Sequence, residues 1–164
     1  MSAASPARHV AAVVVVAMAE EAEPFLNALL ERGAAEPEPP TPLGEARARS
    51  LRLPGEQAER ELILVRSGIG LVAAASALAT ILTRVRPDAI VSAGTTGGLG
   101  REVEVGDVCA STALAYTDAD ATAFGYALGQ TPGQPESFAG DPALLERLGE
   151  VGQEALRGAT ASSG

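Results

Sequence analysis

Two adjacent carboxylates, Glu20 and Glu21, follow an apolar run over residues 10–17. A carboxylate that emerges at the end of a buried strand can act as a general base and take a proton from water. The same two residues also suit the first turn of a helix, where the helix dipole stabilises negative charge on a solvated face. Residue types alone favour the solvated helical turn, and the catalytic role stays open.

A glycine-rich turn, GTTGG over residues 94–98, offers a second kind of chemistry. Its glycines leave backbone N–H groups exposed, and Thr95 and Thr96 add hydroxyl groups, so the turn suits an anion or the polar edge of a ligand. It lacks the lysine of a phosphate-binding P-loop, which argues against hydrolysis of nucleoside triphosphates. A tight turn between a strand and a loop is the structural alternative.

The stretch SGIGLVAA, residues 67–74, contains the G-x-G-x-x-A spacing of dinucleotide-binding turns in Gly68, Gly70 and Ala73. In such sites the acid that binds the ribose belongs at the end of the next strand, whereas Asp88 lies at its predicted start. A tight turn and close helix packing explain the glycines better. A module that binds NAD or FAD stays as an alternative of a different class.

Alternating strands and helices are predicted to position these turns. Strands are expected over 10–17, 45–53, 60–66, 88–94 and 106–116, a loop over 33–44, and helices over about 19–32, 71–85 and 141–155. One hairpin joins otherwise alternating elements, which predicts an α/β fold with a mixed sheet and helices on both faces. Ligands of such folds bind where the carboxyl ends of strands meet loops, and all three turns fall there.

The length and charge of the chain limit the classes of function. The 164 residues suit one domain, predicted over 10–164 behind a disordered tail of residues 1–9. With 21 acidic residues against 12 basic ones, the chain has no electrostatic footprint for nucleic acid or for an anionic membrane surface. The apolar run at 10–18 is too short to span a bilayer, so a cytoplasmic location is expected.

The cysteine and histidine content argues against several catalytic and metal sites. Cys109 is the single cysteine and falls in an apolar run, so we expect a buried structural thiol, without a disulfide or a paired-cysteine zinc site. His9 is the single histidine and lies in the predicted tail. A Ser–His–Asp or Cys–His mechanism is therefore not expected.

Taken together, the turns resemble those of the 5′-methylthioadenosine/S-adenosylhomocysteine nucleosidases, in the nucleoside phosphorylase/hydrolase superfamily. The similarity runs from about Val13 to the last residue and is carried by AMAEEAEPF (17–25), SGIGLVAAA (67–75), RPDAIVSAGTTGGL (86–99), VGDV (105–108) and YTDADATAFGYALGQTPGQP (116–135). The resemblance implies a three-layer α/β/α sandwich with a central mixed sheet. It also implies a cytoplasmic homodimer that acts on a small-molecule nucleoside without a metal ion or organic cofactor.

The implied reaction is hydrolysis of the N-glycosidic bond of methylthioadenosine or adenosylhomocysteine to adenine and a thioribose product. By position, Glu21 is the family's water-activating carboxylate, Met18 packs near the ribose, and Ile69 lines the alkylthio side. The residues that face the ribose and the purine are Thr95, Thr96 and Gly97. As adenine leaves, the sugar resembles an oxocarbenium ion, so a carboxylate can stabilise that charge and deprotonate water, as in glycoside hydrolysis.

The aromatic residues are concentrated in one stretch of the chain. Four of the five lie from Tyr116 to Phe138, among many glycines and prolines. In the family this stretch crosses the two-fold interface and covers the neighbouring chain's pocket. The matching positions at the alkylthio and ribose end are Ala121, Phe124, Tyr126 and Pro132. The resemblance therefore implies binding residues shared between protomers, with aromatic anchors that suit an interface.

Other activities of the superfamily stay open. Phosphorylases that resemble this chain carry a phosphate-binding arginine two residues before the G-T turn, and Ser92 occupies that position here. Without a guanidinium the bidentate grip on phosphate is lost, so water is the expected nucleophile. The GTTG sequence of this turn is nevertheless closer to that of some phosphorylases. A purine or uridine phosphorylase and a futalosine-type hydrolase are therefore the alternatives.

The resemblance also implies a domain that is incomplete at its C-terminal end. The family continues beyond the position of Gly164 with a Met-Glu pair for the ribose hydroxyls and an aspartate that protonates the purine. Asp118 and Asp120 do not match that aspartate by position. We therefore expect residues 1–164 alone to be inactive, and a truncated fragment that only binds nucleosides or dimerises is a further alternative. Adenine release from methylthioadenosine by these residues alone would refute this expectation.

Overall fold

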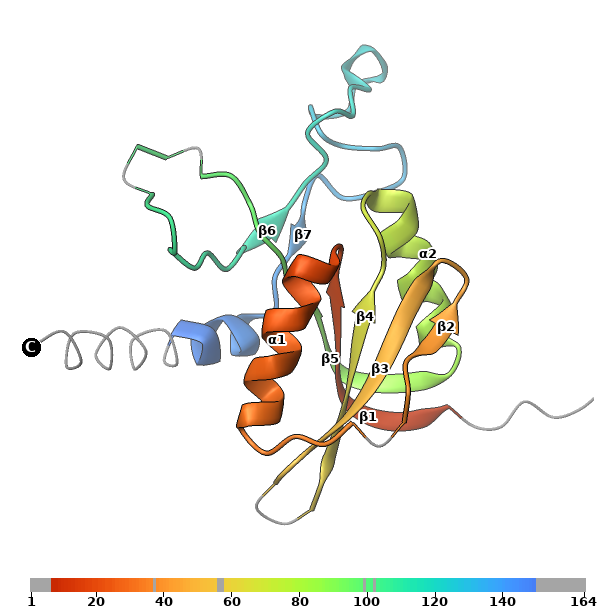
Figure 1. Ribbon diagram of the computed structural model, residues 1–164. Helices are drawn as coiled ribbons and strands as arrows, with labels where there is room; N and C mark the ends of the chain where they lie inside the picture. The colour runs from red at the N-terminus through yellow and green to blue at the C-terminus, as the bar shows by residue number, and fades with distance from the viewer. Residues whose placement is uncertain (1–6, 37, 56–57, 99, 102, 150–164) are drawn as a thin grey trace, which may run out of the picture. The chain divides into compact units, whose positions relative to one another are not determined.

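The computed structural model describes residues 7–36, 38–55, 58–98, 100–101 and 103–149. The chain divides into two compact units, Met1–Gly97 and Gly98–Gly164. The first unit contains the main sheet and two helices, and the second contains shorter elements (Figure 1). The single domain expected over 10–164 stays a prediction.

A five-stranded mixed sheet forms the centre of the first unit. Its strands are β1 (Arg8–Val16), β2 (Thr41–Leu43), β3 (Ala46–Leu53), β4 (Arg60–Arg66) and β5 (Val85–Ser92). They are ordered β2-β3-β4-β1-β5, with β1 parallel to β4 and β5, and with the β2–β3 and β3–β4 pairs antiparallel. The carboxyl ends of β1, β4 and β5 therefore share one edge of the sheet.

One helix covers each face of this sheet (Figure 1). Successive residues of a strand point to opposite faces, and β1 shows this directly. Val14 packs in a cluster with α1 (Ala19–Glu31), whereas Val15 packs in a cluster with α2 (Leu71–Leu82). The predicted mixed sheet with helices on both faces is confirmed. Neither these helices nor any other in the described residues combine the length and apolar character needed to cross a membrane.

The valine-rich run of β1 explains its central place in the sheet. Val13 is fully buried, and the next three valines are at most 7% exposed. β-Branched side chains fit a pleated surface, and each buried valine stabilises the fold by about 1.5–3 kcal/mol. The strand predicted over 10–17 is confirmed. It begins earlier, at Arg8, so the last two residues of the predicted 1–9 tail belong to the sheet, and residues 1–6 lie outside the described residues.

Several predicted boundaries differ from those observed. The helix predicted to reach residue 85 ends at Leu82, because Val85 is buried in the sheet as the first residue of β5. β5 also contains Pro87, although we placed the strand start after it. Within the described residues β5 pairs only with β1, and an edge strand tolerates a proline. The end of the predicted 33–44 loop forms β2.

The second unit contains fewer strand residues than the sequence predicts. Besides a helix at 142–149, its described elements are β6 (Ala113–Leu114), β7 (Phe138–Ala139) and the 3₁₀ turn η1 (Thr122–Phe124). The strand predicted over 106–116 is wrong except at β6, which pairs antiparallel with β7. Val105 and Val108 are almost fully exposed. Apolar composition suggested burial there, but a strand also needs a neighbour to satisfy its backbone groups.

Two further expectations concern Cys109 and the last helix. Cys109 is exposed, so its predicted burial is wrong. The helix expected over 141–155 is observed at 142–149, and residues 150–155 lie outside the described residues. Asp141 Oδ1 accepts a hydrogen bond from the Leu144 N–H at 2.9 Å, which confirms the predicted N-cap.

Candidate active site

The turns that follow three parallel strands meet at one edge of the sheet. After β4, the Gly68 N–H donates to the Ala17 carbonyl at 3.1 Å. After β5, the Ala93 N–H donates to the Val15 carbonyl at 2.9 Å. These bonds extend the backbone pairing past the ends of the strands. The structure thus brings the AMAEE, SGIG and GTTGG turns together, as predicted.

Glu21 lies at this edge, in the first turn of α1. Its Oε2 accepts the backbone N–H of Ala17 at 2.9 Å and that of Met18 at 3.0 Å. Its Oε1 accepts the backbone N–H of Thr95 at 2.9 Å and the Thr95 hydroxyl at 3.0 Å. The carboxylate therefore connects the turn after β1 to the turn after β5.

These hydrogen bonds stabilise the charged form of the carboxylate. The Thr95 N–H is the largest cause that lowers the pKa of Glu21 below its ordinary value; partial burial opposes the shift, and the other three donors add to it. A carboxylate offers about four acceptor positions, so four donors occupy nearly all of them. Glu21 is only partly buried and remains accessible to solvent.

Glu20 and Glu21 have different surroundings, a difference that residue types alone left open and that the family resemblance had assigned in favour of Glu21. Glu20 is exposed and forms no side-chain hydrogen bond among the described residues. Glu21 stands three residues after the N-cap Met18, the spacing at which a glutamate turns back to the N-cap N–H. This signal is present in the sequence: the spacing distinguishes Glu21 from Glu20 and indicates the Met18 N–H as one of the groups that hold the carboxylate.

The glycines of the SGIG turn are explained by backbone geometry. Gly68 and Gly70 have φ values of +89° and +105°, which side chains disfavour. Asp88 lies near the start of β5, where its Oδ1 is 2.7 Å from His9 Nε2. It does not lie at the carboxyl edge, where a ribose-binding acid belongs. The structure therefore favours a tight turn over a dinucleotide site.

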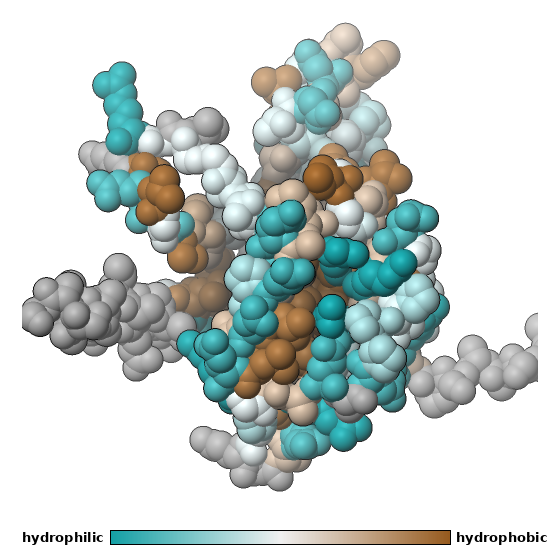
Figure 2. All heavy atoms as spheres, viewed as in Figure 1, coloured by the Kyte–Doolittle hydropathy of each residue, from teal (hydrophilic) through white to brown (hydrophobic). Residues whose placement is uncertain are grey.

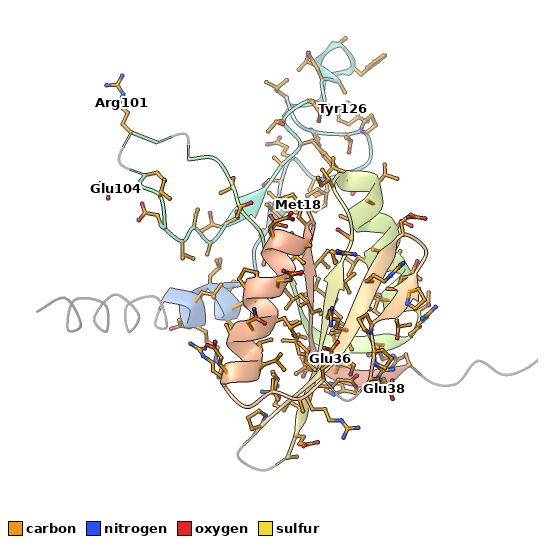
Figure 3. The ribbon with its side chains drawn as sticks, in the orientation of Figure 1. Met18, Glu36, Glu38, Arg101, Glu104 and Tyr126 are labelled. Atoms are coloured by element: carbon orange, nitrogen blue, oxygen red, sulfur yellow. The ribbon has the colours of Figure 1, made fainter. Side chains whose placement is uncertain are left out.

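The other predicted site residues of the first unit lie in the same turns. Met18 is the N-cap of α1, partly buried (Figure 3). Ile69 is 78% exposed in the turn after β4. Thr96 and Gly97 are exposed in the loop after β5, and no side-chain hydrogen bond joins them to Glu21. Their roles in substrate binding stay predictions.

The residues expected to act across a dimer interface belong to the second unit. They are Ala121, Phe124, Tyr126 and Pro132. Phe124 closes η1 and is 83% exposed. Such exposure of a phenyl ring suits a contact with a partner. The substrate-binding role of all four residues stays a prediction.

Comparison with known proteins identifies the family. A family model described as the phosphorylase superfamily matches residues 11–164. The chain belongs to the phosphorylase superfamily. It is 41% identical over 100 residues to the 5′-methylthioadenosine/S-adenosylhomocysteine nucleosidase of Actinobacillus succinogenes, a match that covers 61% of this chain and 44% of that protein.

Solved structures of superfamily members support the fold. The methylthioadenosine/adenosylhomocysteine nucleosidase of Neisseria meningitidis, in complex with methylthio-immucillin-A, is 35% identical with a TM-score of 0.76 over 88% of this chain and 58% of that one. The adenosylhomocysteine nucleosidase of Streptococcus pyogenes, in complex with 5-methylthiotubericidin, is 30% identical with a TM-score of 0.73 over 93% and 60%. The chain thus spans about half the length of the relatives it matches, and the expected α/β/α fold is confirmed.

A cavity of about 390 Å³ lies beside α1, but Glu21 does not line it. Figure 2 shows an apolar strip flanked by hydrophilic side chains over this part of the molecule. The apolar lining includes Ala22, Leu26 and Leu64, and the arginines are Arg47, Arg49 and Arg66. Arg49 Nη1 is paired with Glu36 Oε1 at 2.8 Å. We therefore place the candidate active site of this superfamily member at the strand ends, around Glu21.

We predict that acid destabilises the wild-type chain more than the Glu21→Gln variant. The pKa of Glu21 is lowered in the folded state, so its stabilising contribution is fully present above the ordinary glutamate pKa. It is lost as the pH falls through the lowered folded-state pKa. Thermal melts between the ordinary glutamate pKa and the lowered folded-state pKa should therefore show a higher melting temperature for wild type than for Glu21→Gln, and this difference should shrink as the pH falls.

The exposed neighbour supplies the control for this measurement. Glu20→Gln removes the same charge one residue away, without the hydrogen bonds to the turns. Its melting temperature should follow the wild-type dependence on pH. Parallel curves for wild type and Glu21→Gln would contradict the electrostatic account.

Proposed function

We propose that the protein hydrolyses the N-glycosidic bond of 5′-methylthioadenosine or S-adenosylhomocysteine, a step of methionine salvage and nucleoside catabolism. The observation that carries the proposal is the ionised Glu21 carboxylate, held at the carboxyl edge by donors from two turns. The relatives' names and the nucleoside analogues bound in their solved structures support it. The chain spans about half of those relatives, so the activity belongs to the whole protein.

Glu21 is given two tasks in the proposed reaction. As the C1′–N9 bond breaks, its electron pair leaves with adenine and positive charge develops on the sugar, which the carboxylate stabilises. The oxygen of water then bonds to C1′, and its proton passes to Glu21. A separate acid protonates the departing base. We assign that acid, and the glutamate that binds the ribose hydroxyls, to no residue within 1–164.

The approach of water requires an acceptor position on Glu21. Three of its four donors are backbone N–H groups fixed by the sheet edge and by α1, whereas the fourth is the Thr95 hydroxyl. A hydroxyl rotates freely and can donate elsewhere. We therefore infer that water takes the place of the Thr95 hydroxyl at Oε1, while the N–H groups keep the carboxylate oriented.

A homodimer is part of the proposal. Leu71 and Val72 at the start of α2 are 70% and 84% exposed, and α2 contains no charged residue. Exposed apolar surface of this kind marks association sites. In the second unit Phe124 is also exposed, which supports its proposed place against a partner's pocket. A cytoplasmic location, without membrane or nucleic-acid partners, completes the proposal.

A phosphorylase is the second candidate within the same superfamily. The matching family model is described as the phosphorylase superfamily, and the GTTG sequence of the turn is closer to that of some phosphorylases. Against it, Ser92 ends β5 at the position of the phosphate-binding arginine. Hydroxyls and N–H groups alone give a weaker grip on phosphate than a guanidinium. Hydrolysis by water is therefore the function we propose.

We predict that Glu21→Gln lowers kcat for adenine release by the full-length enzyme about 10²–10⁴-fold, the usual contribution of a general base. The amide keeps the shape of the side chain but neither takes a proton nor stabilises a cation. Glu20→Gln is the matched control and should keep wild-type turnover. Retained activity in Glu21→Gln would remove Glu21 from the mechanism.

We predict that Phe124→Ala weakens both dimerisation and substrate affinity in the full-length enzyme. Loss of a central aromatic anchor costs about 2 kcal/mol or more at an interface. Sedimentation and KM measurements report the two effects separately. Val108→Ala, at an exposed apolar position outside residues 116–138, is the control and should leave both values unchanged. If dimerisation and KM both stayed at wild-type values in Phe124→Ala, the interface role would be wrong.

A further inference from the structure

Gly94 packs directly against the Glu21 carboxylate. A Cβ atom built on Gly94 would lie 2.8 Å from Glu21 Oε1, 3.2 Å from Cδ and 3.4 Å from Oε2. Gly94 is exposed, but non-bonded carbon and oxygen atoms repel each other at 2.8 Å wherever they lie, so this Cβ would overlap the carboxylate. Any side chain at position 94 would therefore compete with Glu21 for the same space.

The backbone conformation of Gly94 does not itself require glycine. Positive φ values, which disfavour other residues, occur at Gly68 and Gly70 but not at Gly94. The following turn residue Gly97 also lacks a positive φ, and a Cβ there would meet nothing within 4 Å. Glycine at position 94 is thus explained by the space that Glu21 occupies.

Hydrogen bonds hold both sides of this contact in place, so a shift of either side would break some of them. On the β5 side, the Ala93 N–H donates to the Val15 carbonyl, and the Thr95 N–H donates to Glu21 Oε1, each at 2.9 Å. These bonds fix the backbone on both sides of Gly94. On the α1 side, the N–H groups of Ala17 and Met18 hold the other carboxylate oxygen. An added methyl group would therefore displace the carboxylate.

We propose that Gly94 is a positioning residue, whose missing side chain lets Oε1 of Glu21 reach the Thr95 donors. A methyl group at position 94 pushes Oε1 away and breaks the Thr95 bonds first, because these lie on the crowded side. The catalytic consequence rests on the proposed role of Glu21. The steric coupling between Gly94 and Glu21 does not depend on that role, so it can be tested without substrate.

The test is a double-mutant cycle on the full chain, with melting temperature as the readout. Gly94→Ala should lower the melting temperature when Glu21 is present, and lower it much less in the Glu21→Ala background, where the carboxylate is absent. If Gly94→Ala does not fold, Glu21→Ala should restore folding. Gly97→Ala is the matched control, and its effect should be the same in both backgrounds. An equal loss for Gly94→Ala in both backgrounds, or an unfolded double variant, would overturn the proposal.

A second readout separates this proposal from the proposed function. Carbon NMR of the Glu21 carboxyl should show a pKa raised toward the ordinary glutamate value in Gly94→Ala and unchanged in Gly97→Ala. An unchanged titration in Gly94→Ala would overturn the positioning role, whatever the enzyme catalyses. In the active full-length enzyme, Gly94→Ala should lower kcat and change KM little. If the coupling is found but Glu21→Gln keeps its activity, the proposed function fails and the positioning role stands.

Discussion

The hydrogen bonds to Glu21 are the constraint on which this site depends. One carboxylate accepts N–H groups from the turn after β1 and from the turn after β5, and so fixes two loops to each other. It can do this only because β1 and β5 are parallel neighbours that end at the same edge. The sheet order brings the two turns together, and α1 places Glu21 between them. The absence of a side chain at Gly94 leaves space for the carboxylate.

The same contact shapes the chemistry proposed for Glu21. Donors that lower its pKa keep the carboxylate ionised, but they also make it a weaker base. A weak base suffices when the bond to the leaving group breaks early, since water then adds to a strongly electrophilic sugar cation. A fixed negative charge beside that cation stabilises the transition state directly. The geometry therefore suits an oxocarbenium-like reaction better than abstraction of a proton from a poorly activated group.

Sequence patterns predicted the parts of the fold that depend on local periodicity. The valine run of β1 and the apolar spacing of α2 identified both elements, and the three turns were placed correctly at strand ends. The strand expected over 106–116 and the burial of Cys109 were wrong, because burial depends on neighbours that apolar composition does not specify. The contact between Gly94 and Glu21 joins residues far apart in the sequence, so only the three-dimensional pairing of β1 with β5 reveals it.

In the proposed reaction, water attacks the sugar at a site organised by Glu21. We would test this by product analysis of the full-length enzyme with methylthioadenosine, in the presence and absence of phosphate. We predict that free methylthioribose is the sugar product in both cases and that the rate stays the same when phosphate is omitted. Formation of a sugar 1-phosphate, or turnover that requires phosphate, would contradict the account and assign the protein to the phosphorylases.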